Sequence, residues 1–499
     1  MKNQVYNPYL PSWEYVPDGE PHVFGGRVYV YGSHDLFGGC VFCLGDYVCW
    51  SAPVDDLSDW RYEGIIYKKS DDPANAAGRM VLYAPDVTQG PDGRFYLYYV
   101  YDKVGFVSVA VCDSPAGRYE FYGYVHYKDG CRLGDRKGDM PQFDPAVITE
   151  GEKTYMYTAF CGNKMKDRIG AMATVLGKDM LTVEEEPRVI APGDCYARGE
   201  KEALNAVAET VATTGCPYRL SSVQNWAGFK GHEFFEASSI RKIGGTYYFV
   251  YSSAVMHELC YATSKSPTDG FVYGGVIVSN CDLHIDSYKP ADMPAAYGAN
   301  NHGGIAKING SWYIFYHRHT NGTWFSRQGC AEKIEILPDG RIPQVEITSC
   351  GLNGGALRGE GEYPAYIACN IFTDKPSVYV GSEFPRVCQD GRDHDDGTPA
   401  EEKDTSYITG ICKNTTIGFK YFDFKGIKTV ALRTRGYIHG DFELRTAWNG
   451  PVLGKITVDS SNFWEEHRAD AAIPDGIHAF YVTFVGTGTG QLKSIEFRK

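Results

Sequence analysis

Five polar side chains stand at one position relative to a repeated aromatic strand. Asp18, Asp86, Asp144, Glu236 and His302 each lie 10 to 12 residues before a tyrosine that follows a turn. Carboxyl and imidazole groups gathered at one point can act as general acid and general base on a substrate. The tyrosines are Tyr29, Tyr96, Tyr155, Tyr248 and Tyr313. One such acid alone would be explained as a turn residue between hairpins, but five in register indicate a site.

Three of these acids are embedded among apolar neighbours. The sequences around them are Ala84-Pro85-Asp86, Phe143-Asp144-Pro145 and Phe235-Glu236-Ala237. Removal from water disfavours a charged carboxylate, so such surroundings raise a carboxyl pKa and suit a general acid. The stretch from His232 to Glu236 resembles the zinc-protease HExxH pattern. It lacks the second histidine, and its aromatic residues favour a strand over a helix, so a zinc hydrolase is not expected.

The segments that contain the five tyrosines share one plan, a turn residue followed by aromatic residues that alternate with aliphatic ones. This pattern is typical of the second strand of a hairpin. The tyrosines are spaced by 67, 59, 93 and 65 residues, and ~40–65 residues accommodate one four-stranded propeller blade. The longest interval predicts an insertion around residues 200–214. Because the innermost strand of each blade faces the central channel, a five-bladed β-propeller would bring the five polar residues together near its axis.

A glycine-rich passage over residues 351–361 predicts a domain boundary. Residues 1–350 would form the propeller. Residues 351–499 contain short alternating strands that are typical of a β-sandwich of the jelly-roll kind. The expected fold class is therefore all-β throughout. The 37 tyrosines and 57 glycines agree with strands joined by tight turns.

Composition excludes several classes of partner. The formal net charge of −13 argues against nucleic acid, whose phosphates require basic patches. No membrane partner is expected, because no run of about 18 apolar residues occurs. The 15 cysteines include a single CxxC pair, Cys40 and Cys43, which disfavours a zinc site and a disulfide framework. No signal peptide is visible, so a cytoplasmic location is expected, or secretion if a leader has been removed. The oligomeric state stays open.

The same motifs, in this order and spacing, resemble those of the glycoside hydrolases of family 43 over residues 6–348. The markers are Asn7-Pro8, Pro17-Asp18, Ala84-Pro85-Asp86, Phe143-Asp144-Pro145, Phe235-Glu236-Ala237 and Asn301-His302-Gly303-Gly304. That family has a five-bladed propeller, which agrees with the number of repeats. The resemblance implies that Asp18 is the general base and Glu236 the general acid. It also implies that Asp144 orients the acid and tunes its pKa.

Members of this family invert the anomeric configuration, which has a geometric consequence. Room for an attacking water requires ~6.5–9.5 Å between the two carboxyl groups, against ~5–5.5 Å in a retaining pair. The charge of Asp144 would help Glu236 to keep its proton at neutral pH. The base departs from the usual family pattern, because Asp18 is followed by Gly19 where proline is common.

Further residues resemble the metal and substrate contacts of the family. His302 resembles a channel histidine that contacts a central Ca²⁺ whose shell is completed by water. Its alternative role is a hydrogen bond to backbone or substrate, so it is a candidate for both kinds of contact. Arg327 resembles the last-blade arginine that reaches the bound sugar, with a surface salt bridge as the alternative. The other predicted substrate contacts are Asp86, His34, Asp35 and Trp226.

The expected activity is that of an inverting glycosidase which releases pentose from arabinose- or xylose-containing oligosaccharides, an α-L-arabinofuranosidase or β-xylosidase. The alternatives are an endo-acting arabinanase, another sugar enzyme on a five-bladed propeller, and a noncatalytic glycan-binding propeller. A retaining fructosidase is disfavoured, because Phe143 stands where its Arg-Asp-Pro motif has arginine. The segment over residues 486–492 is similar to family 6 carbohydrate-binding modules. Trp448, Trp464 and Tyr437 are candidate glycan contacts there, although core packing is the first expectation for each.

Overall fold

The computed structural model describes residues 4–161, 169–193, 218–221, 226–391 and 404–499. Within these ranges the regular structure is almost entirely β-strand, with a few short 3₁₀ helices. The insertion predicted around residues 200–214 lies outside the described residues. No helix in the described ranges is long and apolar enough to cross a membrane. Every cysteine in them is free.

The first two blades are four-stranded antiparallel sheets in which the strand order follows the chain. Blade I contains β1 (Glu20–Phe24), β2 (Arg27–Tyr31), β3 (Tyr47–Pro53) and β4 (Arg61–Tyr67). The 3₁₀ helix η1 (Pro73–Asn75) leads to the next blade. Blade II contains β5 (Asp86–Gln89), β6 (Phe95–Tyr99), β7 (Ser108–Cys112) and β8 (Glu120–Tyr124).

The remaining three blades vary this plan. Blade III adds a short parallel strand and contains β9 (Ala146–Glu150), β10 (Lys153–Thr158), β11 (Gly170–Leu176), β12 (Val183–Pro192) and β13 (Arg219–Leu220). After the 3₁₀ helix η3 (Trp226–Phe229), blade IV contains β14 (Phe234–Ile243), β15 (Thr246–Ser253), β16 (Glu258–Ser264) and β17 (Val272–Ser279). Blade V has three strands, β18 (Ile305–Ile308), β19 (Ser311–His319) and β20 (Arg327–Ile334).

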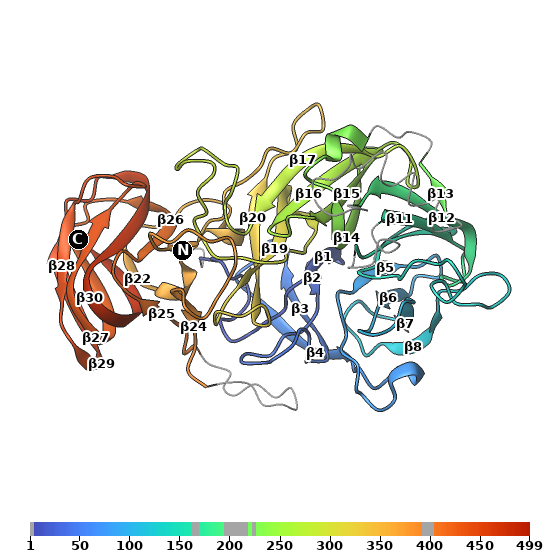
Figure 1. Cartoon of the computed structure of the whole chain (residues 1–499), viewed down its shortest axis with the longest axis horizontal. Helices are drawn as coiled ribbons and strands as arrows, with labels where there is room; N and C mark the ends of the chain where they lie inside the picture. Colours follow the sequence, from blue (N-terminus) through green and yellow to red (C-terminus); the bar gives the residue numbers. More distant parts are fainter. Residues whose placement is uncertain (1–3, 162–168, 194–217, 222–225, 392–403) are drawn as a thin grey trace.

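The first strands of the blades pack against each other in a closed ring. β1 contacts β5, β5 contacts β9, β9 contacts β14, β14 contacts β18, and β18 returns to β1. Figure 1 shows the blades grouped in this order, from blue β1 to yellow β19 and β20. The predicted five-bladed propeller is therefore confirmed, and the first strand of every blade lines its channel.

The five tyrosines that align the repeat lie in the second strands, β2, β6, β10, β15 and β19. Two-residue turns join the first and second strands in four blades. In the turns Gly25-Gly26 and Gly244-Gly245 the φ values lie between 54° and 80°. Tight hairpins require this conformation, and glycine adopts it without steric cost. Aromatic pairs such as Phe24 and Phe95, with ring centroids 5.0 Å apart, then fill the space between blades.

The N-terminal segment covers the outer edge of blade V. Asn7 Nδ2 donates to the Ala331 carbonyl at 3.0 Å and to Glu332 Oε1 at 2.9 Å. Asn7 Oδ1 accepts from the Ala331 N–H at 2.9 Å. The Tyr9 N–H donates to the Gly329 carbonyl at 3.3 Å. These contacts take the place of a fourth strand, because β20 would otherwise expose an unpaired edge.

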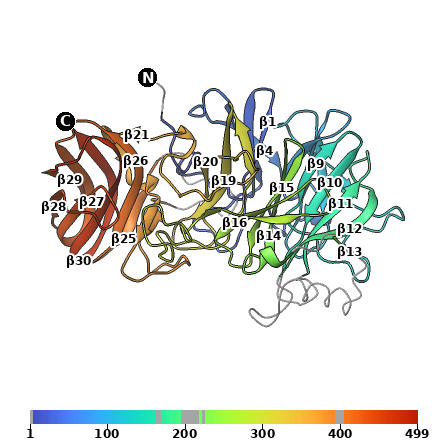
Figure 2. The same ribbon diagram turned by 90° about the horizontal axis from the view of Figure 1, so that it is seen from above.

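The C-terminal strands form a second domain beside the propeller (Figure 2). Its elements are η4 (Gly351–Asn353), β21 (Leu357–Arg358), β22 (Gly361–Pro364), η5 (Ala365–Ile367), β23 (Asn370–Phe372), β24 (Arg386–Cys388), β25 (Tyr407–Ile411), β26 (Thr416–Phe424), β27 (Thr429–Arg445), β28 (Gly454–Val458), β29 (Ser461–Asp470) and β30 (Gly476–Arg498). The long strands β27 and β30 pair along almost all of β27, and the other strands join them in one sheet. The all-β prediction is confirmed, and the second domain is a single sheet curled around its own apolar core.

The two domains meet across a buried ion pair. Lys420 of β26 is fully buried, and its Nζ lies 3.1 Å from Asp282 Oδ2 and 3.0 Å from Glu346 Oε2 of the propeller. A buried ammonium group without partners is strongly destabilising, so this contact favours one relative placement of the domains. The apolar core also changes here. Ile347 packs with blades IV and V, whereas Cys350 packs with the second domain.

Candidate active site

A cavity of about 230 Å³ lies at the end of the channel where the chain enters the first strands. The predicted catalytic acids Asp18, Asp144 and Glu236 line it, together with His302 and Arg327. The other lining residues are Phe42, Tyr83, Ala84, Phe143, Phe160, Phe235, Met256, Asn300 and Trp324. Apolar walls with a few convergent polar groups are typical of a small-molecule site.

Unusual backbone conformations direct the acids toward the cavity. Asp18 and Asp144 have φ values of 57° and 43°, in the left-handed region that aspartate tolerates better than most residues. Glu236 lies in β14, where the pairing with β15 shifts on both sides of it and Ala237 has a φ of 68°. This bulge adds a residue, which explains why Glu236 stands one residue further from its tyrosine than Asp18 or Asp144. Bulges and left-handed residues concentrate at functional sites because they redirect side chains.

Basic groups hold Asp18 in its ionised form. Arg327 Nη1 donates to Asp18 Oδ1 at 2.8 Å, and His317 Nδ1 lies 3.3 Å from the same oxygen. Burial by itself favours the neutral carboxyl, but Arg327 and His317 outweigh it and hold the pKa of Asp18 well below its usual value. At neutral pH Asp18 is therefore a carboxylate that can accept a proton.

Asp35 positions this arginine. Its carboxylate accepts from Arg327 Nε at 2.9 Å and from Nη2 at 3.1 Å, and it also accepts from the Arg327 backbone N–H at 3.0 Å. The Phe42 ring covers the guanidinium group, with its centroid 4.8 Å from the central carbon. Arg327 is only 2% exposed. A bidentate pair of this kind fixes the plane of the guanidinium group. Arg327 Nη1 therefore keeps its hydrogen bond to Asp18.

Glu236 and Asp144 have the opposite tendency. Burial, and after it the charge of Asp18, raise the pKa of Glu236 to about 8. Burial, Glu236 and Asp18 also raise the pKa of Asp144, although Asp144 Oδ2 accepts from the Ala237 N–H at 3.0 Å. Repulsion between Asp144 and Glu236 disfavours ionisation of both groups together, in addition to burial and the charge of Asp18. Asp144 also fixes the backbone beside the acid.

His302 lies among three of the channel's acids, Asp18, Asp144 and Glu20. Its Nδ1 is 3.8 Å from Asp144 Oδ2 and 4.0 Å from Asp18 Oδ1, and its Nε2 is 4.0 Å from Glu20 Oε1. Burial lowers the pKa of His302 to about 4, so the imidazole is neutral at neutral pH. His302 Nε2 and Glu20 Oε1 are buried and have no hydrogen-bond partner among the described residues. Orphaned polar atoms at this spacing fit a bound water or a hydrated cation.

Asp86 does not face the cavity. It is fully buried at the start of β5, its Oδ1 lies 2.6 Å from His22 Nε2, and its Oδ2 accepts from the Val147 N–H at 2.8 Å. The structure therefore does not place Asp86 among the residues that line the cavity. Both of its oxygens are occupied within the protein.

The turn between the first two strands of blade II is longer than its equivalents in the other blades. The Gly90 N–H donates to the Arg94 carbonyl at 2.8 Å, so three residues rather than two form the turn between β5 and β6. Counting back from Tyr96 through this turn reaches Ala84, which does line the cavity. Asp86 lies two residues further along the strand, at the position that Glu20 occupies in blade I.

Three other predicted substrate contacts belong to the supporting structure. Asp35 holds the arginine of the site and does not line the cavity. His34 Nε2 lies 3.0 Å from Glu14 Oε1, also away from the cavity. Trp226 is fully buried in the apolar core shared by blades III and IV. The structure therefore places none of these three side chains on the cavity wall.

Several residues of the site carry little sequence signal. His317 follows the repeat tyrosine Tyr313 by four positions in β19, and the alternation of that strand could have pointed to it. Its Nε2 donates to the Asn300 carbonyl at 2.8 Å. Phe42 and Trp324 lie in loops without periodicity, and nothing in the sequence distinguishes them from other loop aromatics.

Residues 23–342 match the model of the glycosyl hydrolases of family 43. This range covers well over half of the chain. The chain belongs to glycosyl hydrolase family 43. The predicted family is therefore confirmed. The range of the family model begins after Asp18, so the role of that residue depends on its position in the cavity.

Some relatives of this family 43 chain extend over both domains. A protein named xylosidase/arabinosidase from Thermoclostridium stercorarium is 63% identical over 99% of each chain. A family 43 arabinoxylan arabinofuranohydrolase from Bacillus subtilis, solved with cellotetraose, is 20% identical, covers 99% of this chain and 97% of its own, and has a TM-score of 0.50. A beta-xylosidase/alpha-arabinofuranosidase from a compost metagenome, solved with xylotriose in a calcium-free form, is 26% identical over 69% of this chain and 98% of its own, with a TM-score of 0.50.

Proposed function

We propose that this chain is an inverting glycosidase that releases pentose from arabinose- or xylose-containing oligosaccharides, as an α-L-arabinofuranosidase or β-xylosidase. The observation that carries the proposal is one cavity that holds Asp18 ionised and Glu236 protonated. Opposite protonation states at neutral pH are what a general base and a general acid require. The name of the relative that is 63% identical supports a pentose substrate.

In the proposed reaction Glu236 gives its proton to the glycosidic oxygen while the bond from that oxygen to the anomeric carbon breaks. The leaving alcohol keeps the bonding electron pair. Asp18 takes a proton from a water, and the oxygen of that water forms the new bond to the anomeric carbon on the opposite face. Water is consumed, Glu236 ends ionised, Asp18 ends protonated, and exchange with solvent restores both.

The surrounding residues keep this pair in its working state. Arg327 stabilises the ionised form of Asp18 before reaction, and Asp35 holds Arg327 in place. Asp144 binds the backbone N–H of Ala237, next to Glu236 in the bulge, and thereby orients the acid. Loss of Arg327 or Asp35 would change the protonation of Asp18. Loss of Asp144 would change the direction of the Glu236 side chain.

A cation at the axis is part of the proposal. His302 would hold it, with Glu20 as a second contact and water in the rest of the shell. The support is the pair of buried, unpartnered atoms on these two residues. Calcium prefers oxygen ligands, which water and one carboxylate can supply here. Bound Ca²⁺ would add positive charge beside the acids and so favour the ionised form of Asp18.

The second domain is proposed to be a glycan-binding module of the family 6 kind. Tyr437 and Phe463 support this, since they are 71% and 77% exposed on β27 and β29. Trp448 is partly buried and stacks on Phe372 with ring centroids 4.5 Å apart. A cytoplasmic location remains a proposal too.

The test is hydrolysis of nitrophenyl β-xyloside and nitrophenyl α-L-arabinofuranoside by the full chain. We expect turnover of at least one, and proton NMR of the best reaction should show the inverted anomer first. Release of the retained anomer would contradict inversion. Absence of turnover on these and on arabinan would favour the noncatalytic alternative.

A further inference from the structure

The wall of the active-site cavity continues onto the second domain. Trp324 lines the cavity, and its ring stacks on that of Tyr379, with centroids 6.1 Å apart and planes inclined by 16°. Tyr379 lies between β23 and β24 and is 44% exposed. Nearly parallel rings at this separation are strongly offset, so each leaves part of its face uncovered.

Tyr379 is joined by backbone pairing to the propeller segment that forms the rim. The Gly298 N–H donates to the Val378 carbonyl at 3.0 Å, and the Val380 N–H donates to the Gly298 carbonyl at 2.7 Å. These two bonds enclose Tyr379 in a parallel bridge. Asn300, which lines the cavity, follows Gly298 by two residues. The position of Tyr379 is therefore tied to the cavity itself.

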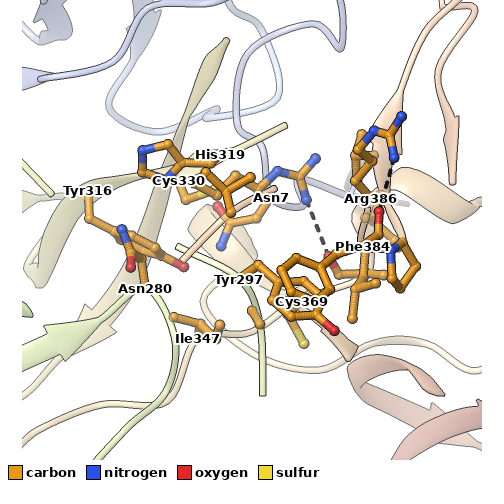
Figure 3. A pocket seen from close by; sticks show the side chains of 18 of the residues that line it. Asn7, Asn280, Tyr297, Tyr316, His319, Cys330, Ile347, Cys369, Phe384 and Arg386 are labelled. Atoms are coloured by element: carbon orange, nitrogen blue, oxygen red, sulfur yellow. Dashed lines mark hydrogen bonds between the residues drawn. The ribbon is translucent and has the colours of Figure 1, made fainter. Parts of the chain in front are cut away.

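Side-chain packing between the two domains also fixes this segment. Figure 3 shows Tyr297 of the propeller and Phe384 of the second domain face to face, with centroids 4.3 Å apart and planes inclined by 13°. The Asn321 N–H donates to the Val387 carbonyl at 2.8 Å, three residues before Trp324. The buried Lys420 at the domain junction adds a further restraint. A platform that is held on both sides loses little conformational entropy when a ligand binds.

Tyr379 is distinguished from the other exposed aromatic side chains of the described ranges by its contact. These side chains are Tyr62, Tyr379, Tyr437 and Phe463. Tyr379 is the one that stacks on a residue of the cavity wall. The cavity, at about 230 Å³, is smaller than the ~300–1,000 Å³ sites of drug-sized ligands. It suits one pentosyl unit, so further units of an oligosaccharide must lie beyond the rim.

We propose that Tyr379 and Trp324 form an aromatic platform on which the leaving-group sugar of the oligosaccharide stacks. The second domain thus supplies a substrate contact to the propeller site. This inference rests on the proposed function. The apolar C–H face of a pyranose ring can cover an aromatic ring, while its hydroxyl groups stay in water at the edge. The platform would favour oligosaccharides over pentosides with a small leaving group.

The experiment compares kcat/KM for xylotriose with kcat/KM for β-xylosyl fluoride, whose leaving group is too small to reach the platform. Arabinotriose and arabinofuranosyl fluoride replace them if the wild type prefers arabinose. For Tyr379→Ala we expect the ratio of the two constants to fall about tenfold, which corresponds to about 1.4 kcal/mol. Tyr379→Phe keeps the ring and should hold the ratio within about twofold, because the phenol hydroxyl adds little to stacking.

Tyr62→Ala is the matched control. Tyr62 is 47% exposed and contacts Trp50 with ring centroids 5.3 Å apart, but it lies on β4 at the outside of blade I. In Tyr62→Ala the ratio of kcat/KM for xylotriose to kcat/KM for β-xylosyl fluoride should equal that of the wild type. Thermal melting verifies folding, and Tyr379→Gln, which keeps bulk without a ring, replaces the alanine variant if that one unfolds.

The outcomes are distinguishable. An unchanged ratio in both Tyr379→Ala and Tyr379→Gln, with active wild type, would overturn the platform and leave the proposed function intact. An equal fall in both constants would also overturn it, since that result indicates a general structural role. Failure of the wild type to hydrolyse any pentoside would overturn the proposed function, and the platform with it.

Discussion

Two tiers of carboxyl groups lie along the same channel, two residues apart on equivalent segments of the chain. The outer tier, Asp18, Asp144 and Glu236, lines the cavity. The inner tier contains Glu20 and Asp86 at the first positions of β1 and β5. Glu236 is partly buried, whereas Asp18 and Asp144 are buried as Glu20 and Asp86 are. Burial alone therefore does not separate the two tiers.

The tiers differ in how their oxygens are occupied. In the inner tier both oxygens of Asp86 are bonded within the protein, and Glu20 Oε2 accepts from Arg241 at 2.8 Å and Ser239 at 3.1 Å. Burial nevertheless raises the pKa of Glu20 to about 7. In the outer tier Glu236 has a comparably raised pKa and borders open space. A perturbed pKa therefore marks a reacting group only where the group can also reach a substrate.

The largest expected effect is the loss of the outer-tier acid. Glu236→Gln keeps the size of the side chain but cannot donate a proton to the glycosidic oxygen. We expect kcat on the best pentoside to fall by ~10²–10⁴-fold, the usual contribution of general acid catalysis, with little change in stability. Steady-state kinetics and thermal melting measure the two quantities. If Glu236→Gln kept the kcat of the wild type, the outer tier could not be assigned a catalytic role that the inner tier lacks.

The inner tier should respond in the opposite way. Asp86→Ala leaves His22 and the Val147 N–H without their partner, and breaking a buried pair costs about 3–5 kcal/mol. We expect the free energy of unfolding in urea to fall by that amount. In the folded fraction kcat should fall far less than in Glu236→Gln. A kinetic loss without a stability loss would show that Asp86 acts in the reaction.

The pH profile should sharpen the comparison further. Asp18 must be ionised and Glu236 protonated, so kcat/KM should fall above pH about 8, where Glu236 loses its proton. The acid limb should lie below the usual range of aspartate, because Arg327 holds the Asp18 pKa down. Lysine in Arg327→Lys cannot reproduce the planar, bidentate geometry of the guanidinium group. The pKa of Asp18 should therefore rise, and the acid limb of the profile should move to higher pH.

Arg241→Lys is the inner-tier control for that shift. Arg241 pairs with Glu20 and makes no hydrogen bond to an outer-tier acid among the described residues. Its substitution should leave the acid limb in place. Equal shifts in the two arginine variants would mean that the whole channel, rather than the contact of Arg327 with Asp18, sets the pKa.

Local pattern in the sequence was enough for much of this protein. Turn glycines and alternating aromatic residues are properties of single hairpins, so the five repeats and the propeller followed from them. The register then brought Asp18, Asp144, Glu236 and His302 together, because rotation of a repeat makes equivalent positions neighbours. Arg327 was predicted through the family resemblance, and the structure places it on the cavity wall.

Tertiary structure alone decided the rest. One additional turn residue puts the cavity position of blade II 12 residues before Tyr96, whereas Asp86 stands 10 before it. A count that accepts 10 to 12 residues does not detect this difference. Trp226 lies in the apolar core, and only packing between blades reveals that. Trp324 and Tyr379 come from two domains and from segments without periodicity, so their stacking depends on how the domains dock. Hydrophobic alternation determines which face of a strand is buried, but it carries no information about which loops meet at a rim.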